Sequence, residues 1–245
     1  MREPVSNYQS IKVNEGLYAY IWQGMGNNCN TCLFPDVFSG DKPHLLIDPG
    51  HINNGFSNSF EALTFAMGRD GYKINHVGMI IDTHSHSDHC QSNTIFAQSD
   101  SVAIAMSEEE EKFRQTLGKK LDTMFGITPP VFKTTRFLKE GELELGDKNK
   151  LKLQVFITPG HSPGSVCLYL PGEKILITGD VVFNCSVGRT DFPGGDIDSL
   201  QHSIERLSHL DVNYIIPGHS TEMGNVIEGK KNVERNFQAI RMFFG

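Results

Sequence analysis

The sequence predicts an α/β fold in which β-sheets pack centrally and helices lie outside them. Apolar and β-branched segments of strand length cluster in both halves of the chain, and amphipathic helical patterns lie between and after them. The chain has 245 residues, a length that one α/β domain commonly reaches. We therefore expect a single domain that spans residues 1–245.

The composition agrees with a globular protein and excludes several other classes. Hydrophobic residues make up 38% of the chain and charged residues 21%, which argues against disordered, collagen-like and coiled-coil chains. No apolar run approaches the ~18 residues of a membrane span, and the first ten residues lack an apolar signal segment. We expect a cytoplasmic protein without a membrane partner. The net charge of -7 and the absence of a basic tract argue against a nucleic-acid partner; the oligomeric state stays open.

The first half begins with strands and then alternates with helices. Phe56, Phe60, Leu63 and Met67 recur at spacings of three and four, which predicts an amphipathic helix. Ser107 followed by glutamates predicts a capping box and a charged helix whose first turn is solvated. The expected strands are Leu17–Trp22, Cys29–Phe34, His44–Asp48, Val77–Ile81 and Ser101–Met106.

The second half repeats this arrangement. A helix that begins at Asp198 should have a buried stripe, and the last residues should form an amphipathic helix. The stripe is Ile197, Leu200, Ile204 and Leu207, and the apolar residues of the last helix are Val233, Phe237, Ile240 and Phe244. The expected strands are Leu151–Ile157, Ser165–Leu170, Lys174–Thr178 and Tyr214–Ile216.

The strongest chemical signal directly follows the strand Val77–Ile81. His84, His86, Asp88 and His89 supply three imidazoles and one carboxylate within six residues. Imidazole nitrogens and carboxylate oxygens are the usual ligands of zinc, and imidazole also suits iron. This cluster predicts a metal site.

Three further candidate ligands stand singly at junctions between a strand and a loop. His161 follows the strand 151–157, Asp180 follows the strand 174–178, and His219 follows the last strand. Loops at the ends of sheet strands are where functional side chains concentrate. Together with the first cluster, these junctions form a specific set.

In this order the motifs resemble the metallo-β-lactamase-fold superfamily. They are THSHSDH at 83–89, PGHSPGS at 159–165, TGD at 178–180 and PGH at 217–219, with IDPG at 47–50. The string GRTDFPGGD at 188–196 is similar to the glyoxalase II-like (hydroxyacylglutathione hydrolase-like) and persulfide dioxygenase-like branch. The resemblance covers nearly the whole chain and implies a four-layer αβ/βα sandwich with two central mixed sheets.

The resemblance also implies the ligand set. His84, His86 and His161 would hold one metal, and Asp88, His89 and His219 would hold a second. Asp180 would bridge the two. Two divalent ions are implied as cofactors, with zinc favoured and iron or manganese as alternatives.

The implied chemistry is hydrolysis. A hydroxide shared by two metals ~3.5–4 Å apart would attack the carbonyl of a small-molecule thioester or ester. Asp88 and Asp180 are the expected catalytic carboxylates, and Asp88 is the candidate proton acceptor. A glyoxalase II-like thioesterase is the first hypothesis. A mononuclear iron persulfide dioxygenase-like enzyme and a lactonase of the same fold are the alternatives, and a metal-binding scaffold without activity is the fourth.

We expect structural roles for several other residues near these motifs. Cys29 and Cys32 should be buried strand cysteines, and Cys185 should line the pocket without binding metal. His51 should lie on the surface. Asp48 should support the ligand loops through hydrogen bonds, and Arg189 should pair with Asp191 beside the site.

Overall fold

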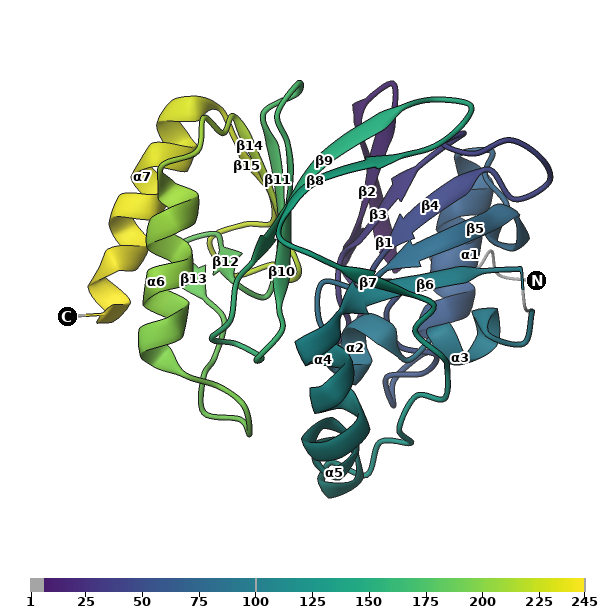
Figure 1. Ribbon diagram of the computed structural model, residues 1–245, viewed down its shortest axis with the longest axis horizontal. Coiled ribbons are helices and arrows are strands. Elements are labelled where there is room, and N and C mark those ends of the chain that lie inside the picture. The colour runs from purple at the N-terminus through teal and green to yellow at the C-terminus, as the bar shows by residue number, and fades with distance from the viewer. Residues whose placement is uncertain (1–6, 100, 245) are drawn as a thin grey trace.

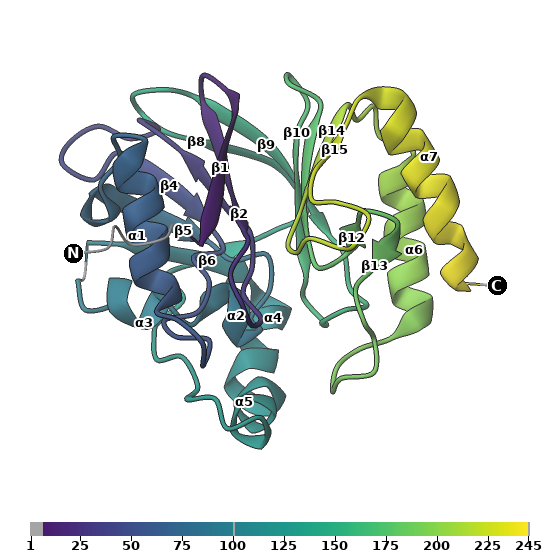
Figure 2. The same cartoon turned by 180° about the vertical axis from the view of Figure 1, so that it is seen from behind.

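The computed structural model describes residues 7–99 and 101–244 of the chain. Two large mixed β-sheets lie at its centre, and helices cover their outer faces (Figure 1). The reverse view shows α1 outside one sheet and α7 outside the other (Figure 2). The predicted α/β architecture, with two central mixed sheets and outer helices, is therefore confirmed.

The first sheet has seven strands that lie side by side in sequence order. Each neighbouring pair from β1 to β4 is antiparallel, whereas each neighbouring pair from β4 to β7 is parallel. The strands are β1 (Tyr8–Asn14), β2 (Leu17–Trp22), β3 (Thr31–Phe34), β4 (His44–Ile47), β5 (Val77–Ile81), β6 (Ala103–Ser107) and β7 (Arg136–Leu138).

The second sheet has six strands in the order β15-β14-β11-β10-β9-β8. Both β9 and β11 are antiparallel to β10, and β14 is parallel to β11, so the carboxyl ends of β9, β11 and β14 lie at the same edge. The strands are β8 (Gly141–Leu145), β9 (Leu151–Ile157), β10 (Val166–Leu170), β11 (Ile175–Gly179), β14 (Tyr214–Pro217) and β15 (Ile227–Glu228). A short separate hairpin consists of β12 (Val182–Phe183) and β13 (Ser186–Val187).

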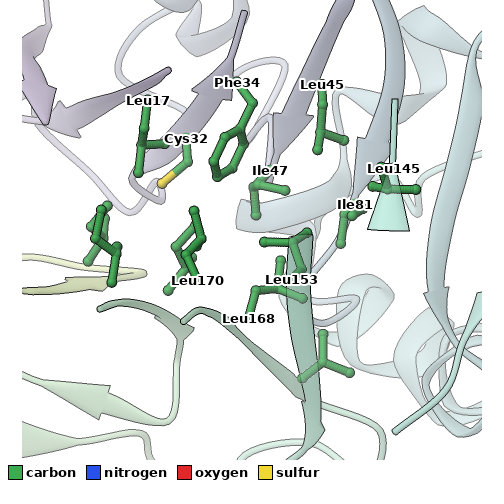
Figure 3. Packing of buried hydrophobic residues seen from close by; sticks show 14 of the residues in the cluster. Leu17, Cys32, Phe34, Leu45, Ile47, Ile81, Leu145, Leu153, Leu168 and Leu170 are labelled. Atoms are coloured by element: carbon green, nitrogen blue, oxygen red, sulfur yellow. The ribbon is translucent and has the colours of Figure 1, made fainter. Parts of the chain in front are cut away.

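Apolar side chains from both sheets meet between them and form the main core. Leu17, Phe34 and Ile47 of the first sheet face Leu153 and Leu168 of the second (Figure 3). Alternate residues of a strand point to opposite faces, so each sheet also has an outer apolar face that must be covered.

Helices cover these outer faces. Leu63 and Met67 of α1 pack on the first sheet, whereas Leu200 of α6 and Phe237 of α7 pack on the second. The helices are α1 (Ser59–Arg69), α2 (Ser87–Cys90), α3 (Asn93–Phe96), α4 (Glu108–Phe113), α5 (Lys119–Met124), α6 (Ile197–Ser208) and α7 (Lys230–Ile240), with short turns η1 (Ile74–His76), η2 (Arg114–Gly118) and η3 (Arg241–Phe244). Within the described ranges, no helix combines the length and apolar character that crossing a membrane requires.

Several predicted boundaries are wrong by one to three residues. Phe56 precedes α1 and is 67% exposed, because the Asn58 side chain caps the helix at the Glu61 N–H instead. Asp196, rather than Asp198, precedes α6 and caps it at the Ser199 N–H. Ile197 is the first residue of this helix and is 44% exposed, so its predicted burial is wrong. Cys29 lies before β3 rather than within it.

A buried arginine joins α4 to the irregular segment 125–135. Arg114 is 3% exposed and donates two hydrogen bonds to Glu111, at 2.8 Å and 2.9 Å. It also donates to the carbonyls of Pro130 and Phe132 and lies 4.0 Å from the centre of the Phe132 ring. Burial alone would raise the pKa of Glu111, but the Arg114 guanidinium, with smaller contributions from neighbouring donors, lowers it below the usual value.

We expect Glu111→Gln to lower the free energy of unfolding by about 1–3 kcal/mol at pH 7. Because the pKa of Glu111 is lower in the folded state, the carboxylate stabilises the fold above its unfolded pKa of 4.5. The difference from wild type should shrink as the pH falls below that value. Urea unfolding of the metal-free protein at pH 7 and pH 3.5 measures it. Glu109→Gln, on the exposed face of α4, is the control and should show a small difference at both pH values.

Candidate metal centre

The candidate ligands come together because four strands end at one place. His84 and His86 lie in the loop between β5 and α2, and Asp88 and His89 lie in α2 itself. The other three residues follow the strands of the second sheet whose carboxyl ends share an edge: His161 after β9, Asp180 after β11 and His219 after β14. Backbone hydrogen bonds from Val166 to Thr83 and from Asn30 to Gly218 join the two edges at this point.

Three imidazoles form the first group of ligand atoms. Nδ1 of His86 lies 3.1 Å from Nε2 of His84 and 2.9 Å from Nε2 of His161. Nitrogens bound to one tetrahedral zinc ion at 2.0–2.1 Å would be about 3.4 Å apart. The three nitrogens therefore have close to the spacing that a single ion requires.

The second group consists of two imidazoles and a carboxylate. Nε2 of His219 lies 3.2 Å from Nε2 of His89 and 3.1 Å from Oδ2 of Asp88. Nε2 of His89 is 3.8 Å from the same oxygen. These three residues also have the spacing of a metal site.

Asp180 lies between the two groups. Its Oδ2 is 3.5 Å from Nε2 of His161 in the first group and 3.5 Å from Nε2 of His219 in the second. Its Oδ1 is buried without a well-directed hydrogen bond from any described residue, although His89 is near. A Cβ atom at Gly218 would come within 2.3 Å of Oδ1, so any larger residue at position 218 would clash with this carboxylate.

The chemistry of the donor set fits divalent cations. Burial and then the neighbouring imidazoles lower the pKa of His84 well below 6.5, and burial with His161 lowers the pKa of His86 to about 3. Both rings are therefore neutral and can offer a nitrogen lone pair to a metal. The structure places all seven expected side chains together; that each binds metal stays a prediction.

The carboxylates alter the protonation of the second group. Burial alone would lower the pKa of His219, but Asp180 and Asp88 outweigh it and raise the pKa to about 10. Asp180, Asp48 and Asp88 raise the pKa of His89 well above its usual value in the same way. The metal-free site consequently holds protons on these rings, and a bound cation would displace them.

Residues outside the ligand set fix the ligand rings. Oδ2 of Asp48 lies 3.0 Å from Nδ1 of His89, and Asp48 also accepts hydrogen bonds from the backbone N–H and the hydroxyl of Thr83. The expected supporting role of Asp48 is confirmed. His161 donates from Nδ1 to the backbone carbonyl of Arg189 at 2.7 Å, which leaves Nε2 directed at the cluster.

Glu110 supports the site in a way that the sequence did not indicate. We expected it on a solvated helix start, but it is fully buried. Its Oε1 accepts hydrogen bonds from the Ser85 N–H (2.8 Å) and hydroxyl (2.7 Å). Its Oε2 accepts from the Ser162 hydroxyl (2.7 Å) and the Gly164 N–H (2.9 Å). One carboxylate thus joins the loop that carries His84 and His86 to the loop that carries His161.

The helix start explains why this glutamate turns inward. The Ser107 hydroxyl accepts from the Glu110 N–H at 3.1 Å, as an N-cap should, and it donates to the Gly164 carbonyl at 2.6 Å. The Glu110 side chain contacts the two loops instead of returning to the Ser107 backbone. A capping-box pattern was visible in the sequence, but the partner loop lies more than fifty residues away.

The cluster opens into a cavity of about 1260 Å³. His51 lines this cavity and is only 5% exposed, with Nδ1 3.0 Å from Oε1 of Gln91, so its predicted surface position is wrong. Asn27 also lines it and donates to Oδ2 of Asp88 at 2.7 Å. Neither polar contact had a recognisable sequence signal.

The cysteines are not among the candidate ligands in the described chain. Cys29 and Cys32 are buried and free, and burial raises the pKa of both thiols. Cys185 is exposed on the turn of the β12–β13 hairpin and does not line the cavity, so that prediction is wrong. Arg189 and Asp191 form the expected ion pair beside the site.

The sandwich and its histidine–aspartate cluster define a metal-binding hydrolase. Residues 37–219 match the model of the Metallo-beta-lactamase superfamily. The chain belongs to this superfamily.

Similar proteins include metallo-hydrolases of several organisms. The probable metallo-hydrolase MJ0888 of Methanocaldococcus jannaschii is 32% identical over 75% of this chain and 85% of its own length. The hydroxyacylglutathione hydrolase GloC of Haemophilus influenzae is 31% identical over 76% and 84%. Among solved structures, the BLEG-1 B3 metallo-beta-lactamase has a TM-score of 0.66 at 26% identity and covers 95% of this chain and 99% of its own. TTHA1623, solved in a di-iron-bound form, has a TM-score of 0.65 at 26% identity and covers 85% and 93%.

Proposed function

We propose that the protein is a glyoxalase II-like thioesterase that hydrolyses a small-molecule thioester, or a related ester, with two divalent metal ions. The observation that carries this proposal is the pair of ligand groups that share Asp180 at the base of an open cavity. The hydroxyacylglutathione hydrolase among the relatives supports it. Zinc is the favoured metal, and the di-iron form of a structural neighbour keeps iron as an alternative.

The metals would supply Lewis acidity, which ionises water near neutral pH and polarises a carbonyl. The chain's own residues hold and orient the reacting groups. His84, His86 and His161 are the three neutral donors of one site, and Asp180 places negative charge between the two sites.

Asp88 is the candidate proton acceptor. Burial alone would raise its pKa, but His89 and His219 lower it well below the usual value, so the carboxylate is ionised. The Asn27 amide holds Oδ2 of Asp88 at 2.7 Å, which orients the other oxygen. In the reaction, the oxygen of water bonds to the acyl carbon and the C–S bond breaks. The electron pair leaves on sulfur, and the proton that Asp88 accepts from the water passes to that sulfur, so that a carboxylic acid and a thiol result.

Protein purified without added metal tests this function. We expect two metal ions per chain by elemental analysis, hydrolysis of thioesters, and no oxygen uptake with a persulfide. The panel should include S-lactoylglutathione, a lactone and a β-lactam, because the fold relatives include a B3 metallo-beta-lactamase. His84→Ala should lose metal and activity together, whereas His209→Ala, at an exposed helix end, should keep both.

Two results would contradict the proposal. A single iron per chain with oxygen consumption would identify the persulfide dioxygenase-like alternative. Turnover of lactones alone, with two metals bound, would identify the lactonase.

A further inference from the structure

The walls of the cavity above the ligand cluster are largely apolar. Leu121, Phe125 and Ile127 line one side, from α5 and the turn after it. Phe183 and Val187 line another side, from the β12–β13 hairpin in the second half of the chain (Figure 1). Phe192 joins them, and its ring lies 5.4 Å from that of Phe125 in an edge-to-face arrangement. We call these six residues the apolar wall.

The cavity has little positive charge to offer a substrate. Arg189 is the one lysine or arginine among its lining residues in the described chain. This guanidinium already donates to both oxygens of Asp191, at 2.6 Å and 2.5 Å, and stacks on Phe192 at 3.8 Å. Asp122 adds negative charge to the lining and accepts a hydrogen bond from Ser87.

Three of the four side-chain amides that line the cavity donate to other protein groups, and the fourth, Asn53, accepts from the Gly55 N–H. Asn27 donates to Asp88, and Asn54 bonds to the backbone of residues 25, 56 and 57. Carboxylates removed from water need cationic or several polar partners. A glutathione thioester carries two carboxylates, and beyond the metal cluster this cavity presents one cation that is already paired.

We propose that the natural substrate has an apolar acyl chain, held against the apolar wall, and a thiol or alcohol part without carboxylates. The proposal rests on the hydrolase function above and narrows its substrate class. This substrate differs from the glutathione thioester after which the hydroxyacylglutathione hydrolase relative is named. Each methylene buried against the apolar wall should raise kcat/KM about threefold to fourfold.

A matched thioester series tests the proposal on the metal-loaded protein. Acetyl, butyryl, hexanoyl and octanoyl groups are attached to the neutral thiol N-acetylcysteamine and, in parallel, to glutathione. We expect kcat/KM to rise about tenfold with each two methylenes, until the wall is covered. For the same acyl group, kcat/KM for the glutathione thioester should be no higher than kcat/KM for the N-acetylcysteamine thioester.

Variants of the wall connect this result to the cavity. Phe125 is 54% exposed, so the Phe125→Ala variant should fold. In this variant kcat/KM should depend less steeply on acyl chain length, whereas Phe125→Leu should keep most of the dependence. Met124→Ala changes a neighbouring side chain that is 67% exposed and lies outside the cavity lining. This control should leave the dependence unchanged.

The outcomes separate the two proposals. Equal turnover of all chain lengths, with glutathione preferred tenfold or more, would overturn the substrate inference and leave the thioesterase function standing. A steep dependence on chain length that Phe125→Ala leaves intact would also overturn it. If the protein holds two metals and hydrolyses no member of either series, the thioesterase function itself fails, and the inference fails with it.

Discussion

Asp180→Asn is expected to remove about half of the bound metal and to reduce turnover by about a thousandfold. Oδ2 of Asp180 lies 3.5 Å from a histidine nitrogen of each ligand group, so the carboxylate can serve both. Asparagine keeps the size of the side chain and removes the shared charge. Each group keeps three other ligands, so one ion should remain where two were bound.

Metal counts on the purified variant distinguish the competing functions. A mononuclear iron enzyme would use Asp180 as one of three ligands and should lose its iron entirely. Asp41→Asn, which alters an exposed carboxylate, is the control and should change neither metal content nor turnover. Unchanged metal and unchanged turnover in Asp180→Asn would contradict both the hydrolase and the dioxygenase.

Glu110→Gln is expected to lower metal affinity about 10–100-fold and the free energy of unfolding by about 2–4 kcal/mol. Each carboxylate oxygen accepts two hydrogen bonds, one pair from Ser85 and the other from Ser162 and Gly164. A glutamine must place an NH₂ group against one of these pairs of donors. The loop that carries His84 and His86 would then lose its fixed position relative to His161.

The measurements on Glu110→Gln must distinguish displaced metal ligands from an unfolded protein. Metal titration and the absorption spectrum of the cobalt-substituted protein report on ligand geometry, while circular dichroism reports on folding. Glu110→Asp keeps the charge but shortens the reach and should give a partial effect. Glu109→Gln, one residue earlier and exposed, should behave as wild type. A folded Glu110→Gln protein with an unchanged spectrum and affinity would show that Glu110 does not position the ligands.

The sequence predicted the elements that pack most strongly. The buried strands β5, β10 and β11 and the apolar stripe of α6 follow patterns of local spacing, which the sequence displays directly. Strand β1 was not predicted, because Tyr8 is its one fully buried side chain and the polar residues around it obscure the alternation. An edge strand of this kind depends on its partner β2 more than on its own pattern.

In the candidate site, too, local features could be predicted from the sequence and long-range contacts could not. The seven proposed ligands could be predicted because histidines and aspartates that directly follow predicted strands can be recognised from the sequence alone. Glu110 could not, since its partners Ser85 and Ser162 lie in other loops and a run of glutamates at a helix start suggests solvent. His51 was misplaced for a related reason: its burial depends on Gln91, forty residues away.

The two ligand groups also have a consequence for the cohesion of the whole molecule. Each group takes two residues from the segment that follows β5, His84 and His86 from the loop or Asp88 and His89 from α2. Each takes one more from a loop after a strand of the second sheet, His161 in the first group and His219 in the second. Any opening of the interface between the halves of the chain would therefore break both groups at once. Metal supply would then govern the lifetime of the protein as well as its activity. Chains short of metal would separate their sheets more often and expose the core between them to proteases, whereas loaded chains would resist digestion by the free energy of binding.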